Sequence, residues 1–373
     1  MTVSARTVDA IVSVLRGDRV PFPASQITTQ DVIDACSAHE VTGLMADALA
    51  GRDDWPADIL RELTRRASGD AAIELLRGRE LARVLESAGS SGIEPVLIKG
   101  ASLAYTIYGA PYCRPRIDTD LLIRREDVDA LRDVMVRLGY AASVLCEGEA
   151  LFCQFEMSRW DEFGVEHVCD FHWKISTQPV FADVLSYDEV RRRAIRAPAL
   201  GPHALAAGPV DALLLACIHP VMHHRNTRRT LWTYDIHLLA SRLSERELLT
   251  FATLACEKKV ARICAHALRS ARALFNTSVP DALVERLDNA GVEASAEYLV
   301  VNRRWHDELM SSLRSLPSMG HRLRLLREVL FPNPAYMFDA YRLSHTRLSP
   351  LLLPALYLHR NLHGAWKICS GRK

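Results

Sequence analysis

The chain has 373 residues, of which 49% are hydrophobic and 24% are charged, a composition that indicates a globular protein with a sizeable core and excludes a disordered or fibrous one. Its 46 Lys and Arg residues balance 45 Asp and Glu residues, so the net charge of +1 gives no overall attraction for duplex nucleic acid. The nine cysteines form no Cys-x-x-Cys pair, which argues against a zinc ribbon or a disulfide framework and favours a reducing, cytoplasmic location.

No segment predicts export or a membrane span. Charged residues interrupt the apolar residues of positions 1–20, unlike the apolar core of a secretion signal. The most apolar runs, 210–222 and 350–358, are shorter than the roughly 18 residues that a transmembrane helix needs. We therefore expect a cytoplasmic protein without a membrane span.

Three regions follow one another along the chain. Residues 1–90 predict an N-terminal helical region, because apolar residues such as Leu81 and Val84 recur at helical spacing until the Gly89-Ser90-Ser91-Gly92 cluster. Residues 91–200 alternate strand and helix signals and predict a small α/β core. Residues 201–373 return to helical spacing and predict a larger C-terminal helical region. Within the core we expect a strand at 95–98, a turn at 99–100 followed by a helix, a strand at 116–123, a helix at 126–138 and a strand at 165–173. The first helices of the C-terminal region are expected at 210–224, 231–243, 245–258 and 260–275.

The last part of the chain is locally basic. No acidic residue follows Asp339, and we interpret the segment first as a solvated face. Its basic residues are Arg342, Arg347, Arg360, Lys367, Arg372 and Lys373.

Two carboxylates in the 116–123 strand are the most informative feature of the sequence. Asp118 and Asp120 are two residues apart, so both side chains point to the same face of the strand. Carboxylates held this closely repel each other unless a cation neutralises them, and hard oxygen ligands suit Mg²⁺ or Mn²⁺. The pattern favours a phosphate-bearing substrate, although ordinary surface strands also carry Asp-x-Asp.

A second candidate site lies where the 95–98 strand meets the next helix. Gly100 stands at this junction, where free backbone N–H groups and the helix dipole attract anions. Lys99 offers an ammonium group and Ser102 a hydroxyl, so the junction is suited to holding a triphosphate. The alternative is a simple turn glycine beside a lysine in water.

The 165–173 strand offers a third carboxylate. Asp170 stands in an otherwise apolar run, so its charge requires a partner: a metal ion, a proton from an attacking hydroxyl, or an arginine in a structural salt bridge. His172 shares its face and would orient a carboxylate or contact the substrate; a hydrogen-bonded core histidine is the alternative.

Further candidates flank these strands. Arg114 precedes the Asp-x-Asp strand and would contact a phosphate or pair with an acidic residue. His219 and His223 are one helical turn apart, and with Asp235 they make a possible metal-ligand set. Pro220 disturbs that turn, so helix packing or the lining of an acceptor pocket is favoured over a zinc site.

Five short segments occur in an order that carries a family resemblance. They are Lys99-Gly100-Ala101-Ser102-Leu103-Ala104, Arg114-Pro115, Asp118-Thr119-Asp120-Leu121-Leu122-Ile123, Gly139-Tyr140 and Asp170-Phe171-His172-Trp173. In this order they resemble the signature of a poorly characterised bacterial nucleotidyltransferase family in the polymerase-beta-like nucleotidyltransferase superfamily. The similarity extends to helical His and Trp-x-x-Asp elements at His219, His223, Trp232 and Asp235 and covers most of the chain.

The resemblance implies an α+β fold with a small mixed-sheet nucleotidyltransferase core between the two helical regions. It implies that Asp118, Asp120 and Asp170 bind two divalent ions and are the catalytic residues. An acceptor hydroxyl would attack the α-phosphorus of a nucleoside triphosphate in line, and pyrophosphate would leave. The residues expected to contact the nucleotide are Lys99, Gly100, Ser102, Arg114 and His172.

This chain departs from the wider superfamily at two points. It has Lys99-Gly100-Ala101 where the superfamily has Gly-Ser or Gly-Gly, and the interval from Gly100 to Asp118 is longer. We expect Mg²⁺- or Mn²⁺-dependent transfer from an NTP, ATP by default, to a hydroxyl or phosphate of a small molecule or peptide. The alternatives are a non-catalytic nucleotide- or peptide-binding protein and a phosphotransferase that uses the same metal site.

Overall fold

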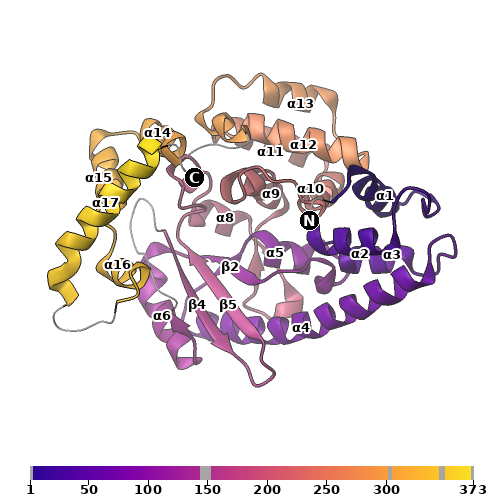
Figure 1. Ribbon diagram of the computed structural model, residues 1–373, viewed down its shortest axis with the longest axis horizontal. Coiled ribbons are helices and arrows are strands. Elements are labelled where there is room, and N and C mark those ends of the chain that lie inside the picture. Colours follow the sequence, from indigo (N-terminus) through magenta and orange to yellow (C-terminus); the bar gives the residue numbers. More distant parts are fainter. Residues whose placement is uncertain (1–2, 143–152, 301–304, 344–348, 371–373) are drawn as a thin grey trace.

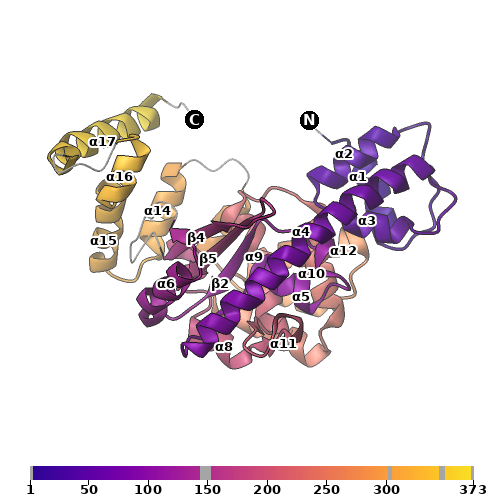
Figure 2. The same cartoon turned by 90° about the horizontal axis from the view of Figure 1, so that it is seen from below.

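Four helices precede the sheet in the computed structural model, which describes residues 3–142, 153–300, 305–343 and 349–370. Ser4 caps the first helix, and Thr28 and Asp31 form a capping box at the second. The fourth helix has 34 residues and is about 50 Å long, and it runs from the N-terminal helices along the sheet (Figures 1 and 2). The helices are α1 (Ala5–Leu15), α2 (Thr29–Ala38), α3 (Thr42–Leu49) and α4 (Ala57–Ser90), the last ending inside the predicted glycine-serine cluster.

The sheet has seven strands in the order β3-β4-β5-β2-β1-β7-β6 among the described residues. β2 pairs antiparallel with β1 and parallel with β5, so the mixed sheet and the α+β fold are confirmed. The strands predicted at 95–98, 116–123 and 165–173 are confirmed, whereas β4 was not anticipated. The strands are β1 (Val96–Leu97), β2 (Asp118–Leu122), β3 (Ala141–Ala142), β4 (Gln154–Trp160), β5 (Glu166–His172), β6 (Ile195–Arg196) and β7 (Leu205–Ala206).

Each face of the sheet packs against different helices. Leu97 and Leu121 join a hydrophobic cluster with α4 and with α6 (Val128–Arg137). Val96 and Leu122 point the other way and join a cluster with the C-terminal helices. Because side chains alternate along a strand, Asp118 and Asp120 share the face of Leu122, which α5 (Lys99–Thr106) and α9 (Pro209–His223) cover.

Helices dominate the rest of the chain, and the four predicted between 210 and 275 are confirmed. The last four helices lie together at one edge of the molecule (Figure 1). Besides α9, the helices are α7 (Pro179–Ala182), α8 (Tyr187–Arg193), α10 (Thr230–Arg242), α11 (Glu245–Glu257), α12 (Ala261–Phe275), α13 (Asp281–Asp288), α14 (Trp305–Ser315), α15 (Met319–Leu330), α16 (Pro334–Ala340) and α17 (Leu353–Ser370).

The regional boundaries near residues 90 and 200 stay predictions. The first half of α4 packs with the N-terminal helices through Leu63, and its second half packs with the sheet through Leu85. Among the described residues, no helix has the length and apolar character that crossing a membrane requires. Three residues of the basic segment, Arg347, Arg372 and Lys373, lie outside the described residues.

Replacing a large side chain in the middle of the sheet should destabilise the protein. Phe171 is fully buried on β5, and its ring centroid lies 4.9 Å from that of Phe155. We expect Phe171→Ala to lower the free energy of unfolding by about 3–5 kcal/mol, because the truncation leaves a cavity. Urea titration measures the loss. The matched control is Phe163→Ala, whose ring is 66% exposed and whose loss should stay below about 1 kcal/mol.

Candidate active site

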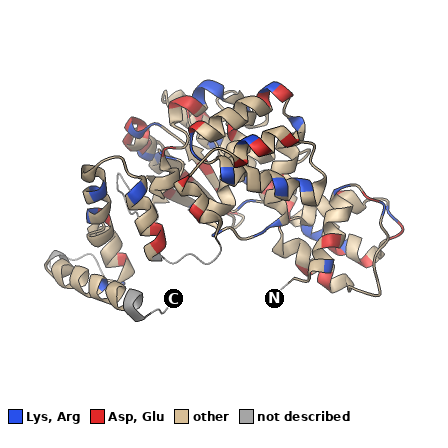
Figure 3. Ribbon diagram, turned by 90° about the horizontal axis from the view of Figure 1, so that it is seen from above, with Lys and Arg blue, Asp and Glu red and all other residues tan. Residues whose placement is uncertain are grey.

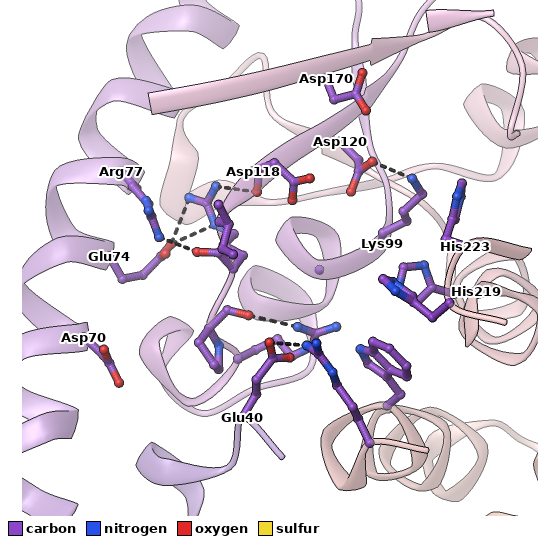
Figure 4. Close-up of a pocket in the computed structure, with 18 of the residues that line it drawn as sticks. Glu40, Asp70, Glu74, Arg77, Lys99, Asp118, Asp120, Asp170, His219 and His223 are labelled. Atoms are coloured by element: carbon purple, nitrogen blue, oxygen red, sulfur yellow. Dashed lines mark hydrogen bonds and ion pairs between the residues drawn. The ribbon is translucent and has the colours of Figure 1, made fainter. Parts of the chain in front are cut away.

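The three predicted carboxylates meet on one face of two neighbouring parallel strands. The register of β2 and β5 places Asp120 beside Asp170 and Leu122 beside His172. Ligand atoms of Asp120, Asp170 and His172 all lie within 4.8 Å of one another. Asp118 lies outside this close group, but it shares the face of Asp120 and lines the same cavity (Figure 4). The period of two therefore brings the acidic side chains together, as the sequence predicts.

Asp120 is the most tightly held of these carboxylates. Its Oδ1 atom lies 2.5 Å from Nζ of Lys99 and 2.9 Å from Nε2 of His172. Burial opposes its ionisation, but Lys99 and His172 hold the pKa of Asp120 well below its usual range. Burial and Lys99 favour the neutral His172 ring, yet Asp170 and Asp120 raise the pKa of His172 above its ordinary value. Asp120 is therefore an anion at neutral pH.

The other two carboxylates keep oxygen atoms available to a cation. Oδ2 of Asp170 accepts a hydrogen bond of 2.9 Å from Nε2 of Gln154 and lies 3.2 Å from Nε2 of His172, while its Oδ1 is buried without a hydrogen-bond partner. Asp118 is exposed at the start of β2 and forms no ion pair within the described residues, and partial desolvation in the cavity together with the charges of Asp120 and Asp170 raises its pKa. A cation would give the buried Oδ1 atom of Asp170 a partner and would offset the repulsion among the three carboxylates. These residues therefore fit Mg²⁺ or Mn²⁺.

The start of α5 forms the second part of the site. No side chain caps this helix end, so its first N–H groups have no side-chain partner. Gly100 lines the cavity, and a Cβ atom there would meet only the Arg114 guanidinium, at 3.6 Å and beyond, so the open side of the glycine faces the cavity. Lys99 adopts a left-handed backbone with φ of 53°, which is unfavourable for a residue with a Cβ and occurs here beside the carboxylates.

Ser102 does not reach this cavity. Its side chain is fully buried, its hydroxyl has no hydrogen-bond partner, and it is absent from the residues that line the cavity in the described structure. The predicted contact between Ser102 and a triphosphate therefore has no support from its position.

Arg114 is held in a buried ion pair, the alternative weighed from the sequence. Its Nε atom donates to both oxygens of Asp235 at 2.9 and 3.0 Å, and the Tyr108 hydroxyl donates to the same carboxylate at 2.6 Å. Asp235 is thus occupied by Arg114 and Tyr108, which argues against a metal site made of Asp235 and the two histidines of α9. Arg114 still lines the cavity beside Gly100.

A second buried arginine anchors the chain just before β2. Arg116 pairs with Glu74 of α4 at 3.0 Å, and the Tyr105 hydroxyl of α5 donates to Glu74 at 2.8 Å. Arg77 of α4 also donates to the backbone oxygen of Arg116. The approach to β2 is therefore fixed between α4, α5 and α10.

The carboxylates and the start of α5 open into one cavity of about 680 Å³. α4 forms one wall with Asp70, Glu74 and Arg77, and α9 forms the opposite wall with His219 and His223 (Figure 4). The cavity lies between the sheet with α5 on one side and α9 and α10 on the other, and α4 adds a wall that the sequence did not indicate.

A family model described as an uncharacterised nucleotidyltransferase matches residues 25–276. The chain belongs to this nucleotidyltransferase family. The match spans α2 to α12 and includes every residue that forms the carboxylate group and the start of α5. No curated protein matches the chain.

The histidine wall of the cavity consists of neutral side chains. Burial and the Lys99 charge lower the pKa of His219 well below its ordinary value and that of His223 to about 3. The two ring centroids are 5.6 Å apart, and the only close group of metal-binding atoms among the described residues is the one at Asp120.

A stack on Trp232 continues this wall. The His224 ring stacks on the Trp232 ring at a centroid distance of 4.4 Å, and the Arg229 guanidinium lies over the same Trp ring and pairs with Glu40. These contacts favour a pocket wall over a zinc site.

Sequence reasoning missed several residues of this candidate site. Gln154 has a sequence signal, because Phe155 and Met157 alternate with polar residues and mark β4 as a half-buried strand. Glu74 and Arg77 have no sequence signal of this kind, because only the packing of α4 against the start of β2 brings them to the cavity.

Breaking the anchor of Arg116 should destabilise the protein. Glu74→Gln removes the carboxylate and leaves the Arg116 guanidinium buried without its counter-charge, so we expect a loss of about 3–5 kcal/mol in the free energy of unfolding. The control is Glu94→Gln, which breaks the 2.8 Å pair with Arg191 at the surface and should cost far less. Equal losses in the two variants, measured by urea titration, would contradict the anchoring role.

Proposed function

We propose that this protein transfers a nucleoside monophosphate from a nucleoside triphosphate to a hydroxyl group of a small molecule or peptide, with Mg²⁺ or Mn²⁺ as cofactor. The observation that carries the proposal is the convergence of Asp118, Asp120 and Asp170 beside the uncapped start of α5, within one cavity. Membership of a nucleotidyltransferase family supports the same reaction class.

The donor triphosphate would bind between α5 and the carboxylates. The N–H groups at Gly100 and the positive end of the α5 dipole would hold phosphate oxygens, and Lys99 would add a charge-assisted hydrogen bond. Asp118, Asp120 and Asp170 would hold the divalent ion, which when bound neutralises charge on the α-phosphate and on the departing pyrophosphate. His172 would keep Asp120 and Asp170 oriented through its Nε2 atom.

In the transfer step, a bond forms between the acceptor oxygen and the α-phosphorus, and the bond from the α-phosphorus to the bridging oxygen breaks. Pyrophosphate carries away the electron pair. The acceptor proton passes to solvent or to Asp170, whose Oδ1 atom has no other partner. The neutral His219 and His223 face this region and would line the acceptor side of the cavity.

The placement of the residues also supports a polymerase-beta-like arrangement. The resemblance implies two carboxylates on one strand, a third on the neighbouring parallel strand and a glycine at a strand-to-helix junction, and the described residues have this arrangement.

We extend the proposal to a cytoplasmic location. The free cysteines fit a reducing compartment, and within the described residues they are Cys36, Cys113, Cys153, Cys169, Cys217, Cys256 and Cys264.

Removing the paired carboxylates should abolish metal-dependent nucleotide binding. Calorimetry with each of the four ribonucleoside triphosphates, with and without Mg²⁺, should show metal-dependent binding of at least one by the wild type. Asp118→Asn with Asp120→Asn should weaken that binding by about a hundredfold or more, because the ion loses two anionic ligands. Asp129→Asn, at a side chain 92% exposed on α6, is the matched control and should bind as the wild type does.

Three outcomes would contradict parts of this proposal. Equal binding with and without Mg²⁺ would indicate a non-catalytic nucleotide-binding protein. Unchanged binding by the double variant would show that the metal assignment is wrong. A nucleoside diphosphate in place of pyrophosphate as the product would identify a phosphotransferase.

Lys99 and the divalent ion should compete for Asp120, because the ammonium lies 2.5 Å from the carboxylate. We expect Lys99→Met to raise Mn²⁺ affinity without nucleotide by about tenfold, since a competing cation is gone. The same change should weaken binding of the metal–triphosphate complex by about tenfold, since a phosphate ligand is lost. Electron paramagnetic resonance of free Mn²⁺ measures the first effect and calorimetry the second.

Lys99→Arg keeps the positive charge and is the control for this pair of measurements. It should resemble the wild type more closely than Lys99→Met in Mn²⁺ affinity. An unchanged Mn²⁺ affinity in Lys99→Met would show that the Lys99–Asp120 pair does not oppose metal binding.

A further inference from the structure

Exposed apolar side chains gather on the helices at the C-terminal edge. Of the 21 large hydrophobic side chains that are exposed in the described residues, nine lie between Met319 and Trp366. This segment is a small part of the chain, so the exposed apolar area is concentrated there. A gathering of this kind marks an interaction surface. The nine are Met319, Leu323, Leu330, Phe331, Leu351, Leu352, Leu358, Leu362 and Trp366.

The residues around α17 make a continuous stripe. Leu351, Leu358, Leu362 and Trp366 are 75%, 61%, 61% and 51% exposed. On α17 itself, Leu358, Leu362 and Trp366 are four residues apart and lie on one side of the helix with Ala355, while Leu351 lies in the 3-10 turn Ser349–Leu352 just before it. At 1.5 Å per residue the row from Ala355 to Trp366 extends about 16 Å. The stripe is therefore long enough to lie along a surface.

Contacts on the other side of α17 keep this stripe turned outward. The Tyr357 hydroxyl donates to the Pro332 carbonyl at 2.6 Å, and Arg360 donates to the Val329 carbonyl at 2.7 Å. Asn361 donates to the Leu330 carbonyl at 3.1 Å. These bonds anchor the polar face of α17 to the C-terminal end of α15 and to Pro332 just after it. The helix cannot rotate its apolar stripe inward without losing them.

The charge of the same region is strongly positive. The described residues of this segment, 319–343 and 349–370, contain six Lys and Arg residues but only two acidic residues, Glu328 and Asp339, whereas the whole chain has 46 basic and 45 acidic residues. In Figure 3 the described part of α17 shows no acidic residue, and its ribbon is tan apart from a short blue stretch. The apolar stripe thus lies within a segment whose net charge differs in sign from that of the rest of the chain.

We propose that α15–α17 form a docking surface for an anionic lipid membrane, on which α17 lies with its stripe in the interface. An anionic bilayer offers both partners that the surface requires, apolar chains for the leucines and negative headgroups for the basic residues. A second copy of this surface would bring like charge against like charge. Duplex nucleic acid would match the charge but offer no apolar surface to the stripe. Trp366 at the end of the stripe suits the headgroup level, where Trp side chains concentrate.

The docking surface is separate from the candidate active site. The family match ends at residue 276, before α15 begins, and none of the residues that line the large cavity belongs to α15–α17. No described helix is able to cross a membrane, so the interaction is one of lying on the surface. The proposal does not depend on the chemistry of the cavity.

Vesicle binding tests the proposal with the full-length protein. Sedimentation with vesicles that contain about 30% phosphatidylglycerol should show binding at least tenfold tighter than with phosphatidylcholine alone, and about 0.5 M salt should weaken it. Leu358→Gln with Leu362→Gln should weaken binding by about tenfold or more, because two apolar side chains no longer enter the interface. Leu249→Gln, at a leucine 55% exposed on α11, is the matched control and should bind normally.

Brominated lipids report which residue enters the bilayer. They should quench part of the tryptophan fluorescence of the wild type, and Trp366→Phe should remove most of that quenching while largely keeping the binding. An unchanged far-ultraviolet circular dichroism spectrum and an unchanged midpoint of urea unfolding would confirm that the double Leu variant is folded.

Three results would overturn the proposal. The first is no binding to anionic vesicles, and the second is equal binding to neutral and anionic vesicles. The third is an oligomer of the wild type that the double Leu variant dissociates, which would assign the stripe to contacts between copies of this chain.

Discussion

The site depends on the concentration of negative charge on one face of β2 and β5. Parallel pairing brings Asp120 beside Asp170, and the period of two adds Asp118 to the same face. Lys99 and His172 offset part of this charge, yet Asp118 is left without an ion pair in the described residues and Asp170 keeps a buried oxygen without a partner. A divalent ion would neutralise the remaining negative charge. Most features of the surrounding structure serve to hold these carboxylates together despite their repulsion.

Two buried arginines supply the rigidity that this arrangement requires. Arg114 ties the segment before β2 to Asp235 on α10, and Arg116 ties it to Glu74 on α4. One helix that precedes β2 in the chain and one that follows it therefore set the position of the strand that carries Asp118 and Asp120. The catalytic role proposed for Asp118 and Asp120 requires such support, because small displacements of a catalytic group cost much of its effect.

Local pattern was sufficient to predict the parts of the fold and site that are set within one element. The alternation along β2 and β5 predicted which side chains share a face, and helical spacing predicted α9 to α12 within a few residues. The local pattern did not predict contacts between elements that are distant in the sequence. The sequence could not show that Lys99 pairs with Asp120, that Ser102 is buried in α5, or that Glu74 of α4 reaches the start of β2. Those contacts depend on how elements pack, which no local periodicity encodes.

The most direct test of the account is a crystal structure of the protein with Mn²⁺ and a non-hydrolysable nucleoside triphosphate, with Mn²⁺ located by its anomalous scattering. The account predicts Mn²⁺ about 2.1 Å from carboxylate oxygens of Asp118, Asp120 or Asp170. It also predicts triphosphate oxygens at the start of α5 and Lys99 turned from Asp120 toward a phosphate. A structure with bound triphosphate, no Mn²⁺ at these carboxylates and an intact Lys99–Asp120 pair would contradict it.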